Sequence, residues 1–404
     1  MKIAFFTDTY LPTHDGVAHV VADIAHTLAR AGHEVMVFTV GSPDLPTETR
    51  EPSGVQVVRT SSIPLPYYSQ YRTAVMPWRV GDEKLKGTDI VHIHTPGMVG
   101  FSGLLAGRHR DIPILGTFHT NIRDMRKSLP DNWFTRKFFR YFWLWNLGIY
   151  ARCNLVTVPA QPARDLMLSS FRTGKGAPVV VLPNGIDLTR FHPGIVEPDW
   201  PDRVHAKGQP LLTYLGRLTE DKGVHRFLQA LQQLPTTLDW HGVIGGEGPE
   251  EPELRRVIES DPVLSKRVSM LGSVLEDEKA ALLSQSRAFV LASTADVAPV
   301  VMLEAMASGA TLVVTKRGGP GEMIQDGTTG LLVDPEDSRS IAGALESTLT
   351  DPAMAERLSR QALQWVSQNA SIDRTAQELL RTYQALERRA PIPLPLIPAG
   401  FAPA

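Results

Sequence analysis

Short apolar runs alternate with helix-forming segments along this chain, and that alternation limits the possible fold more than any single motif does. Strands are expected in the first half at 2–6, 34–40, 55–59, 89–94, 114–118, 155–158 and 179–182. The pattern starts again with strands expected at 211–215, 240–244, 268–271, 289–292 and 311–314. Strands separated by helical segments are typical of parallel, doubly wound sheets. We therefore predict two Rossmann-like α/β domains.

The change from one domain to the other is expected between positions 183 and 210, where turn residues accumulate and the periodicity lapses. We assign residues 1–185 to the first domain and 186–369 to the second. Ligands of such sheets bind beyond the carboxyl ends of the strands, so the cleft shared by the two domains is the expected site. The proline-rich tail at 391–404 cannot be helical.

Composition excludes several classes of protein. The 404 residues include 41 basic and 43 acidic ones, a balance that gives no drive toward nucleic acid. One cysteine, Cys153, cannot form an internal disulfide and suits a reducing compartment. No apolar run reaches the ~18 residues of a membrane-spanning helix, and the N-terminus lacks the pattern of a secretion signal. We expect a cytoplasmic protein.

The stretch from 289 to 319 carries the clearest chemistry. It is expected to fold as a strand, a polar loop, a helix at 300–308 and a second strand. The first amides of that helix, at Val300 and Val301, would bind a phosphate. Glu304 lies more than one turn further in, which suits sugar hydroxyls better. Asp296 lies in the loop, where it either contacts the same ligand or only caps the following turn.

This stretch resembles the Glu-x7-Glu signature of retaining GT-B glycosyltransferases of family four. Its second half, Glu304-Ala305-Met306-Ala307-Ser308-Gly309, matches the signature completely. In the first half Asp296 replaces the first glutamate, Ala298 replaces phenylalanine and Pro299 replaces glycine. The resemblance implies that Asp296 and the amides after it hold the donor sugar and that Glu304 binds ribose. It also implies that the last helix, at about 370–390, returns to the first domain.

Two residues of the first half match the family at the donor site. The family has a glycine pair after its first strand, whose second member touches the donor diphosphate; this chain has Asp15-Gly16, so only Gly16 carries over. His119 ends a strand in Thr117-Phe118-His119-Thr120, and the matching family histidine contacts the donor sugar near its reacting end. Taken alone, a histidine at a strand end is more often simply solvated.

The second half supplies the remaining donor residues. Arg217 and Lys222 lie five residues apart between a strand and a helix, where two cations would bracket a diphosphate. The family uses the same positions for that purpose, although both side chains could also be plain surface charges. Ser273 and Val274 correspond to the positions where the family's backbone contacts the base. We find no metal site, because His92 and His94 lack a nearby third ligand.

The acceptor side is defined less sharply. Residues 64–72 resemble a loop of mannosyl- and other glycosyltransferases that build bacterial glycolipids, although a proline-stiffened surface loop explains them equally well. The acceptor candidates are Tyr10, His14, Tyr68 and Arg72.

A basic, aromatic segment at 121–152 could contact a membrane. Its centre, 133–150, contains nine aromatic residues. A helix there, with Arg136, Lys137 and Arg140 on one side, would either lie on an anionic membrane surface or be an ordinary core helix.

Together these features imply a retaining hexosyltransferase that needs neither cofactor nor metal. Its donor would be a UDP- or GDP-linked sugar and its product an α-glycoside, with a glycolipid or membrane lipid as acceptor. The alternative acceptor is a soluble aminocyclitol or another natural product. Because the loop at 296–299 departs from the family, two further alternatives stay open: a protein that only binds nucleotide sugar, and a sugar-nucleotide epimerase.

Overall fold

A computed structural model of the chain describes residues 1–13, 15–65, 68–75, 83–122, 132–171, 176–195, 204, 206, 208–294 and 296–392, with the backbone alone at 68–70 and 134. The chain divides into two compact units. Unit 1 comprises Met1–Gly185 and the helix that begins at Ile372, and unit 2 comprises Ile186–Ser371. Most of the tail expected at 391–404 lies outside the described residues.

Unit 1 is built on an eight-stranded sheet with the order β10-β9-β8-β7-β1-β2-β4-β3. Its elements are β1 (Lys2–Phe6), α1 (Gly16–Arg30), β2 (Glu34–Val40), β3 (Glu48–Arg50), β4 (Gln56–Thr60), β5 (Ser62–Leu65), β6 (Tyr68–Ala74), β7 (Ile90–Ile93), α2 (Met98–His109), β8 (Ile114–Thr117), α4 (Trp133–Tyr150), β9 (Leu155–Val158), α5 (Gln161–Ser170), β10 (Val179–Val181) and α15 (Ile372–Glu387). Neighbouring strands are parallel except β3, which runs antiparallel to β4.

Within the segment expected as a loop at 64–72, residues 64–65 belong instead to β5 and residues 68–72 to β6. The two strands pair antiparallel, with Pro64 opposite Arg72. The loop interpretation was therefore wrong. It relied on the prolines, but a proline is tolerated where a strand has a free edge and its missing N–H breaks no ladder. Among the described residues this small sheet has two strands, so each of them has such an edge there.

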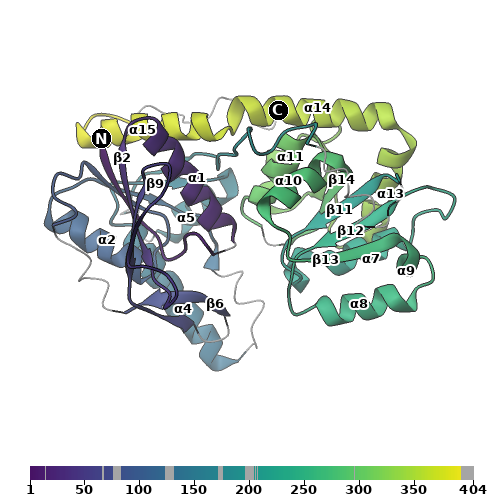
Figure 1. Cartoon of the computed structure of the whole chain (residues 1–404), viewed down its shortest axis with the longest axis horizontal. Helices are drawn as coiled ribbons and strands as arrows, with labels where there is room; N and C mark the ends of the chain where they lie inside the picture. The colour runs from purple at the N-terminus through teal and green to yellow at the C-terminus, as the bar shows by residue number, and fades with distance from the viewer. Residues whose placement is uncertain are drawn as a thin grey trace. The chain divides into compact units, whose positions relative to one another are not determined.

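The last helix completes unit 1, although it follows all of unit 2 in the sequence. Helix α15 packs against α1 near the N-terminus (Figure 1). Its Tyr383 is fully buried, and the Tyr383 hydroxyl lies 2.7 Å from Nδ1 of His92 in β7. The return of the last helix to the first domain is thus confirmed.

Unit 2 is built on a six-stranded sheet, all parallel, with the order β13-β12-β11-β14-β15-β16. Its elements are β11 (Leu211–Leu215), the 3₁₀ turn η4 (Glu220–Lys222), α7 (Val224–Leu231), β12 (His241–Gly245), α8 (Glu251–Ser260), α9 (Leu264–Arg267), β13 (Val268–Gly272), α10 (Glu276–Gln285), β14 (Ser286–Leu291), α11 (Val300–Ser308), β15 (Thr311–Thr315), α12 (Gly318–Met323), β16 (Leu331–Val333), α13 (Ser338–Thr350) and α14 (Pro352–Asn369).

The sheet of unit 2 is buried on both faces, which explains why its strands are continuous apolar runs. In β14, Phe289 and Leu291 pack with residues of α10, α11 and α14. Ala288 and Val290 point to the opposite face and pack with residues of α7, α8 and α13. Successive side chains of a strand alternate between faces, so a strand covered on both sides needs apolar residues at every position.

Each sheet reverses its strand order once, and this reversal fixes where a ligand can bind. In unit 1 the chain proceeds outward from β1 and then returns to β7, on the other side of β1. In unit 2 it proceeds outward from β11 and returns to β14. Ligands of doubly wound sheets bind beyond the carboxyl ends of the strands at such a reversal. The loops that follow β1 and β7 are therefore the candidate ligand-binding loops of unit 1, and the loops that follow β11 and β14 are those of unit 2.

Candidate active site

The loops after β11 and β14 are joined by backbone contacts in unit 2. The amide of Thr294 donates to the carbonyl of Asp221 at 2.9 Å. Gly223 has a positive φ of 74°, and a Cβ at this position would lie 2.3 Å from the carbonyl oxygen of Ala292. Only glycine fits here, because any side chain would push the two loops apart. This close approach holds η4 against the end of β14.

The contact between these two loops brings together Lys222 and Asp296, which the sequence analysis predicts to bind the donor. Nζ of Lys222 forms an ion pair with Oδ1 of Asp296, and the two side chains are only 18% and 12% exposed. Oδ2 of Asp296 is buried and has no hydrogen-bond partner in the described part of the chain. A carboxylate oxygen that lacks a partner at this depth is an available acceptor for a ligand hydroxyl.

The adjacent glycines Gly318 and Gly319, which follow β15, also contact the loop that contains Asp296. The amide of Gly319 donates to the carbonyl of Asp296 at 3.2 Å. A Cβ on Gly319 would lie 1.5 Å from the carbonyl oxygen of Val297, so no side chain fits. The sequence reasoning did not single out Gly318-Gly319, although two adjacent glycines after a strand are a recognisable signal.

Helix α11 presents its first amides beside this loop. Its N-cap is Pro299, which makes no side-chain cap hydrogen bond. The amides of Val300 and Val301 have no carbonyl within their own helix to bond, as at every helix start. An anion is the natural partner for them.

Glu304 lies deeper in α11 and forms a buried ion pair. One carboxylate oxygen is 2.7 Å from Nζ of Lys279 in α10, and the two side chains are 4% and 16% exposed. Nζ of Lys279 is also 2.8 Å from a carboxylate oxygen of Glu276. Burial lowers the pKa of Lys279, but the two carboxylates outweigh it and hold the pKa above its ordinary value. Sequence reasoning missed Lys279.

The other donor candidates of unit 2 lie on the same edge of the sheet. Arg217 follows β11 and is exposed, and its carbonyl accepts a hydrogen bond from the Tyr214 hydroxyl at 3.0 Å. Ser273 and Val274 follow β13, two strands away from β11 in the sheet order. A Cβ on Gly245, at the end of β12, would meet the Val274 side chain at 2.7 Å, so the two loops are closely packed.

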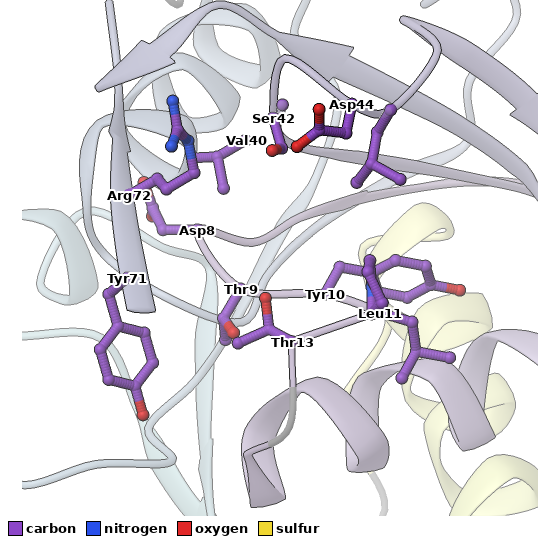
Figure 2. Close-up of a pocket in the computed structure, with 13 residues that line it drawn as sticks. Asp8, Thr9, Tyr10, Leu11, Thr13, Val40, Ser42, Asp44, Tyr71 and Arg72 are labelled. Carbon is purple, nitrogen blue, oxygen red and sulfur yellow. The ribbon is translucent and has the colours of Figure 1, made fainter. Parts of the chain in front are cut away.

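A cavity of about 350 Å³ lies beyond the end of β1 in unit 1 (Figure 2). Its walls come from the loop after β1, the loop after β2 and the hairpin strand β6. The lining residues are Asp8, Thr9, Tyr10, Leu11, Pro12, Thr13, Val40, Gly41, Ser42, Asp44, Leu45, Tyr71 and Arg72. Hydroxyls, carboxylates and one guanidinium line the space together with apolar side chains such as Leu11, Val40 and Leu45, a mixture that is usual for ligand pockets.

Two of the acceptor candidates line this cavity in different ways. The Arg72 side chain is bonded to Ser62, with Nε 2.7 Å from Oγ and Nη2 2.9 Å from the carbonyl oxygen. Tyr10 is 2% exposed, and its hydroxyl donates to Glu51 at 3.0 Å instead of pointing into the cavity. Burial and the neighbouring Glu51 carboxylate raise the pKa of Tyr10. His14 and the side chain of Tyr68 lie outside the described residues.

The start of α1 is capped by a carboxylate. Oδ1 of Asp15 accepts from the amides of Val17 and Ala18 at 2.9 and 2.8 Å. Gly16 is the first residue of that helix. Asp15 stands where the family has the first glycine of its pair. Its negative charge therefore lies at the N-terminus of α1 beside Gly16, where it stabilises the helix.

Three histidines gather at the ends of β7 and β8. Nε2 of His119 is 3.1 Å from Nδ1 of His94, and the rings stack with centroids 5.4 Å apart. His94 in turn lies against His92, at a centroid distance of 3.8 Å. Burial lowers the pKa of His119 from 6.5 to about 4. Among the described residues, no group of three or more potential ligands is arranged to hold a metal ion.

Helix α4 has a buried face and an exposed one, and both carry aromatic residues. Trp143 and Tyr150 are buried in unit 1, whereas Trp133 and Tyr141 are 71% and 61% exposed. Arg136, Lys137 and Arg140 are exposed as well. Nζ of Lys137 lies 4.6 Å above the Trp133 ring. No helix in the described part of the chain is both long and apolar enough to cross a membrane.

Solved structures of known proteins share this organisation. A solved structure of the Anabaena protein HepE in complex with UDP-glucose aligns with a TM-score of 0.74 and 20% identity, covering 95% of this chain and all of the other. The fold is therefore GT-B, with two Rossmann-like units. The family model "Glycosyltransferase Family 4" matches residues 14–190, and "Glycosyl transferases group 1" matches residues 197–365. The chain belongs to this glycosyltransferase family.

Its relatives are named for different activities. A GDP-mannose-dependent alpha-mannosyltransferase of Mycolicibacterium smegmatis is 27% identical, over 83% of this chain and 84% of the relative. A glycogen synthase of Mycobacterium tuberculosis is also 27% identical, over 98% of both chains. An alpha-monoglucosyldiacylglycerol synthase of Streptococcus pneumoniae is 26% identical, over 91% of this chain and 82% of the relative.

Proposed function

We propose that this chain is a retaining hexosyltransferase that moves a sugar from a UDP- or GDP-linked donor to an acceptor hydroxyl and forms an α-glycoside. The observation that carries the proposal is the contact between Lys222 and Asp296 beside the first amides of α11. A cation, free amides and a carboxylate at the reversal of the unit 2 sheet match the phosphate and sugar parts of such a donor.

Donor binding would rearrange the pair. Lys222 would turn from Asp296 to the diphosphate, and Asp296 would accept hydrogen bonds from sugar hydroxyls, using the Oδ2 atom that is buried without a described partner. Glu304 would accept from the ribose hydroxyls while Lys279 holds it in place. Each carboxylate is thus paired with a lysine before the ligand arrives.

In the proposed reaction the bond from the sugar anomeric carbon to the phosphate oxygen breaks, and a bond to the acceptor oxygen forms on the same face. Arg217, Lys222 and the amides of Val300 and Val301 stabilise the negative charge that develops on the leaving diphosphate. The departing phosphate oxygen takes the proton of the acceptor hydroxyl. With two cations at the diphosphate, the reaction needs no divalent metal.

The acceptor is proposed to be a membrane lipid or glycolipid. Its hydroxyl-bearing group would enter the polar cavity beyond β1, and the exposed face of α4 would lie on the anionic membrane surface. Trp133, Lys137 and Tyr141 follow one another at spacings of four residues, and Arg140 lies three residues after Lys137, so the four share that face. Aromatic side chains together with basic ones are typical of helices that lie in the lipid interface. The S. pneumoniae relative, named for a diacylglycerol product, supports this assignment.

Vesicle co-sedimentation tests the membrane contact. We expect binding to vesicles that contain phosphatidylglycerol and weak binding to pure phosphatidylcholine. A variant with Arg136, Lys137 and Arg140 changed to Gln should lose most of that binding. The control is a variant with three exposed arginines of unit 2, Arg255, Arg256 and Arg360, changed to Gln, which alters net charge equally. Equal loss in both variants, or no binding at all, argues for a soluble acceptor.

A thermal-shift panel with UDP, GDP, ADP and their common sugar conjugates tests the donor. A ligand that binds only the folded protein raises Tm by mass action. We expect one nucleotide family to raise Tm clearly and Lys222→Ala to reduce that shift. A flat panel would refute the proposed function. Slow donor hydrolysis without acceptor separates a transferase from a protein that only binds the donor, and release of an altered nucleotide sugar would indicate an epimerase.

A further inference from the structure

The contact between His94 and His119 determines which nitrogen of His119 faces a ligand. Nε2 of His119 is engaged with Nδ1 of His94 at 3.1 Å. Nδ1 of His119 has no hydrogen-bond partner in the described part of the chain and is not fully enclosed. Whatever binds at the end of β8 therefore meets Nδ1, the nitrogen nearer the backbone.

His94 itself is enclosed by aromatic rings. It is 1% exposed, and its ring centroid lies 4.5 Å from that of Phe5 and 3.8 Å from that of His92. Nε2 of His94 is buried without a hydrogen-bond partner among the described residues. His92 is itself fixed, because its nitrogens lie 2.7 Å from the Tyr383 hydroxyl and 2.6 Å from the Thr117 hydroxyl.

Two proton arrangements satisfy the contact between His94 and His119. A neutral imidazole carries one N–H and one bare nitrogen. If His119 donates from Nε2, His94 must carry its own proton on the enclosed Nε2, where no described oxygen or nitrogen accepts it. If His94 donates from Nδ1, its enclosed Nε2 is a bare nitrogen, and His119 carries its proton on Nδ1.

The second arrangement avoids an unpaired N–H in the core. A buried donor without an acceptor costs about 1–3 kcal/mol, and orphaned buried N–H groups are rarer than under-used acceptors. We propose that His94 is a positioning residue that holds His119 as the Nδ1–H tautomer, so that His119 offers a ligand a hydrogen-bond donor and no proton acceptor.

The tautomer limits what His119 can do in the proposed reaction, on which this part of the inference rests. Its Nε2 lone pair accepts from His94, so it cannot take the proton of the acceptor hydroxyl. Its Nδ1–H can donate to an oxygen of the transferred sugar. Burial lowers the pKa of His119 to about 4, so the ring stays neutral near pH 7. The phosphate oxygen then remains the acceptor for the proton, as proposed above.

The tautomer is measured directly in the full-length protein. Long-range ¹H–¹⁵N correlation spectra of ¹⁵N-histidine-labelled protein at pH 7 distinguish Nδ1–H from Nε2–H rings, and His119→Asn and His94→Leu assign the two residues among the twelve histidines. We expect an Nδ1–H pattern for both. An Nε2–H pattern on either ring would overturn the proposal, whatever the activity of the protein.

A matched pair of variants separates hydrogen bonding from packing. The side-chain amide of Asn carries an N–H donor at the δ position, as Nδ1 of His94 does, whereas Leu has none. We expect His94→Asn to keep His119 as the Nδ1–H tautomer and to change kcat/KM by no more than about twofold. In His94→Leu we expect His119 to lose this tautomer and kcat/KM to fall about tenfold. Equal behaviour of the two variants in the spectra would refute the positioning role. Should His94→Leu not fold, the wild-type spectrum still decides. A protein without transferase activity but with the expected spectrum would refute only the proposed function.

Discussion

Replacing Lys279 with Met isolates the buried pair that holds Glu304. The substitution keeps an unbranched side chain of similar length but removes the ammonium, so the Glu304 carboxylate stays buried without the cation 2.7 Å away. The change should destabilise unit 2 and weaken nucleotide binding together, because both depend on the position of Glu304.

The magnitude follows from burial. Breaking a buried ion pair by removing one partner costs about 3–5 kcal/mol. Glu304 is 4% exposed and should bear most of this cost. Glu276, the second partner of Lys279, is 25% exposed and has Arg190 3.9 Å away, so it should lose little. We therefore expect Lys279→Met to lower the free energy of unfolding by about 3 kcal/mol, the lower end of that range. The pKa of Lys279 lies above its ordinary value of 10.5, so the stabilisation is complete below pH 10.5 and is lost only in stronger alkali.

Urea unfolding at pH 7.5, with hydrogen exchange of α10 and α11 to localise the effect, measures this cost. The control is Lys316→Met, which breaks an exposed pair with Asp334 in the same unit and should change stability far less, because water and salt screen exposed ion pairs. Adding Glu304→Gln to Lys279→Met should restore more than half of the loss, because the buried carboxylate that lost the Lys279 ammonium is then neutral as well. If Lys279→Met costs no more than the control, or if the second substitution restores nothing, the burial argument is wrong.

Three further predictions concern other parts of the molecule. Lys222→Ala should lower kcat by about 10²–10³-fold without changing the circular dichroism spectrum, as when a transition-state charge partner is lost, and near-normal turnover would exclude Lys222 from the diphosphate site. The low pKa of His119 means that the folded state binds its proton less readily than the unfolded state, so stability should be complete above pH 6.5 and fall as the pH drops toward 4. The loss of stability should be at most about 3.4 kcal/mol, and His119→Gln should lose less in acid unfolding. Gly223→Ala should cost more than about 2 kcal/mol by calorimetry, because it combines a strained φ with a contact of 2.3 Å. Gly194 has a similar φ, but no atom lies near the position of its missing Cβ. Gly194→Ala should therefore lose only the stability that the strained φ costs.

The sequence predicts the framework well because the strands are buried on both faces. A strand such as β11 (Leu211–Leu215) needs apolar residues throughout, and such a run is visible without any knowledge of its neighbours. The expected strand at 289–292 begins at Ser286 instead, because Ser286 and Arg287 look like loop residues although β14 pairs with β11 there. The short strands β3 and β16 carry too little pattern to be predicted.

The site is predictable only as separate motifs. Lys222 and Asp296 are 74 positions apart, so their contact depends on the fold and on the small size of Gly223 between them. Lys279 gave no signal, because it follows three acidic residues at a helix start and looks like an ordinary surface charge. Its importance comes from Glu304, which approaches from another helix. A sequence pattern does not show which side chains of different helices will form an ion pair in the folded protein.

The bond between Tyr383 and His92 has a consequence for how the protein is made. Unit 1 consists of two pieces of chain, and all of Ile186–Ser371 is synthesised between them. While α15 is still inside the ribosome, the place of the buried Tyr383 beside β7 stays empty, and α1 lacks the helix that packs on it. Unit 2 is continuous in sequence and can complete its core earlier. The part of the protein that is translated first therefore finishes folding last.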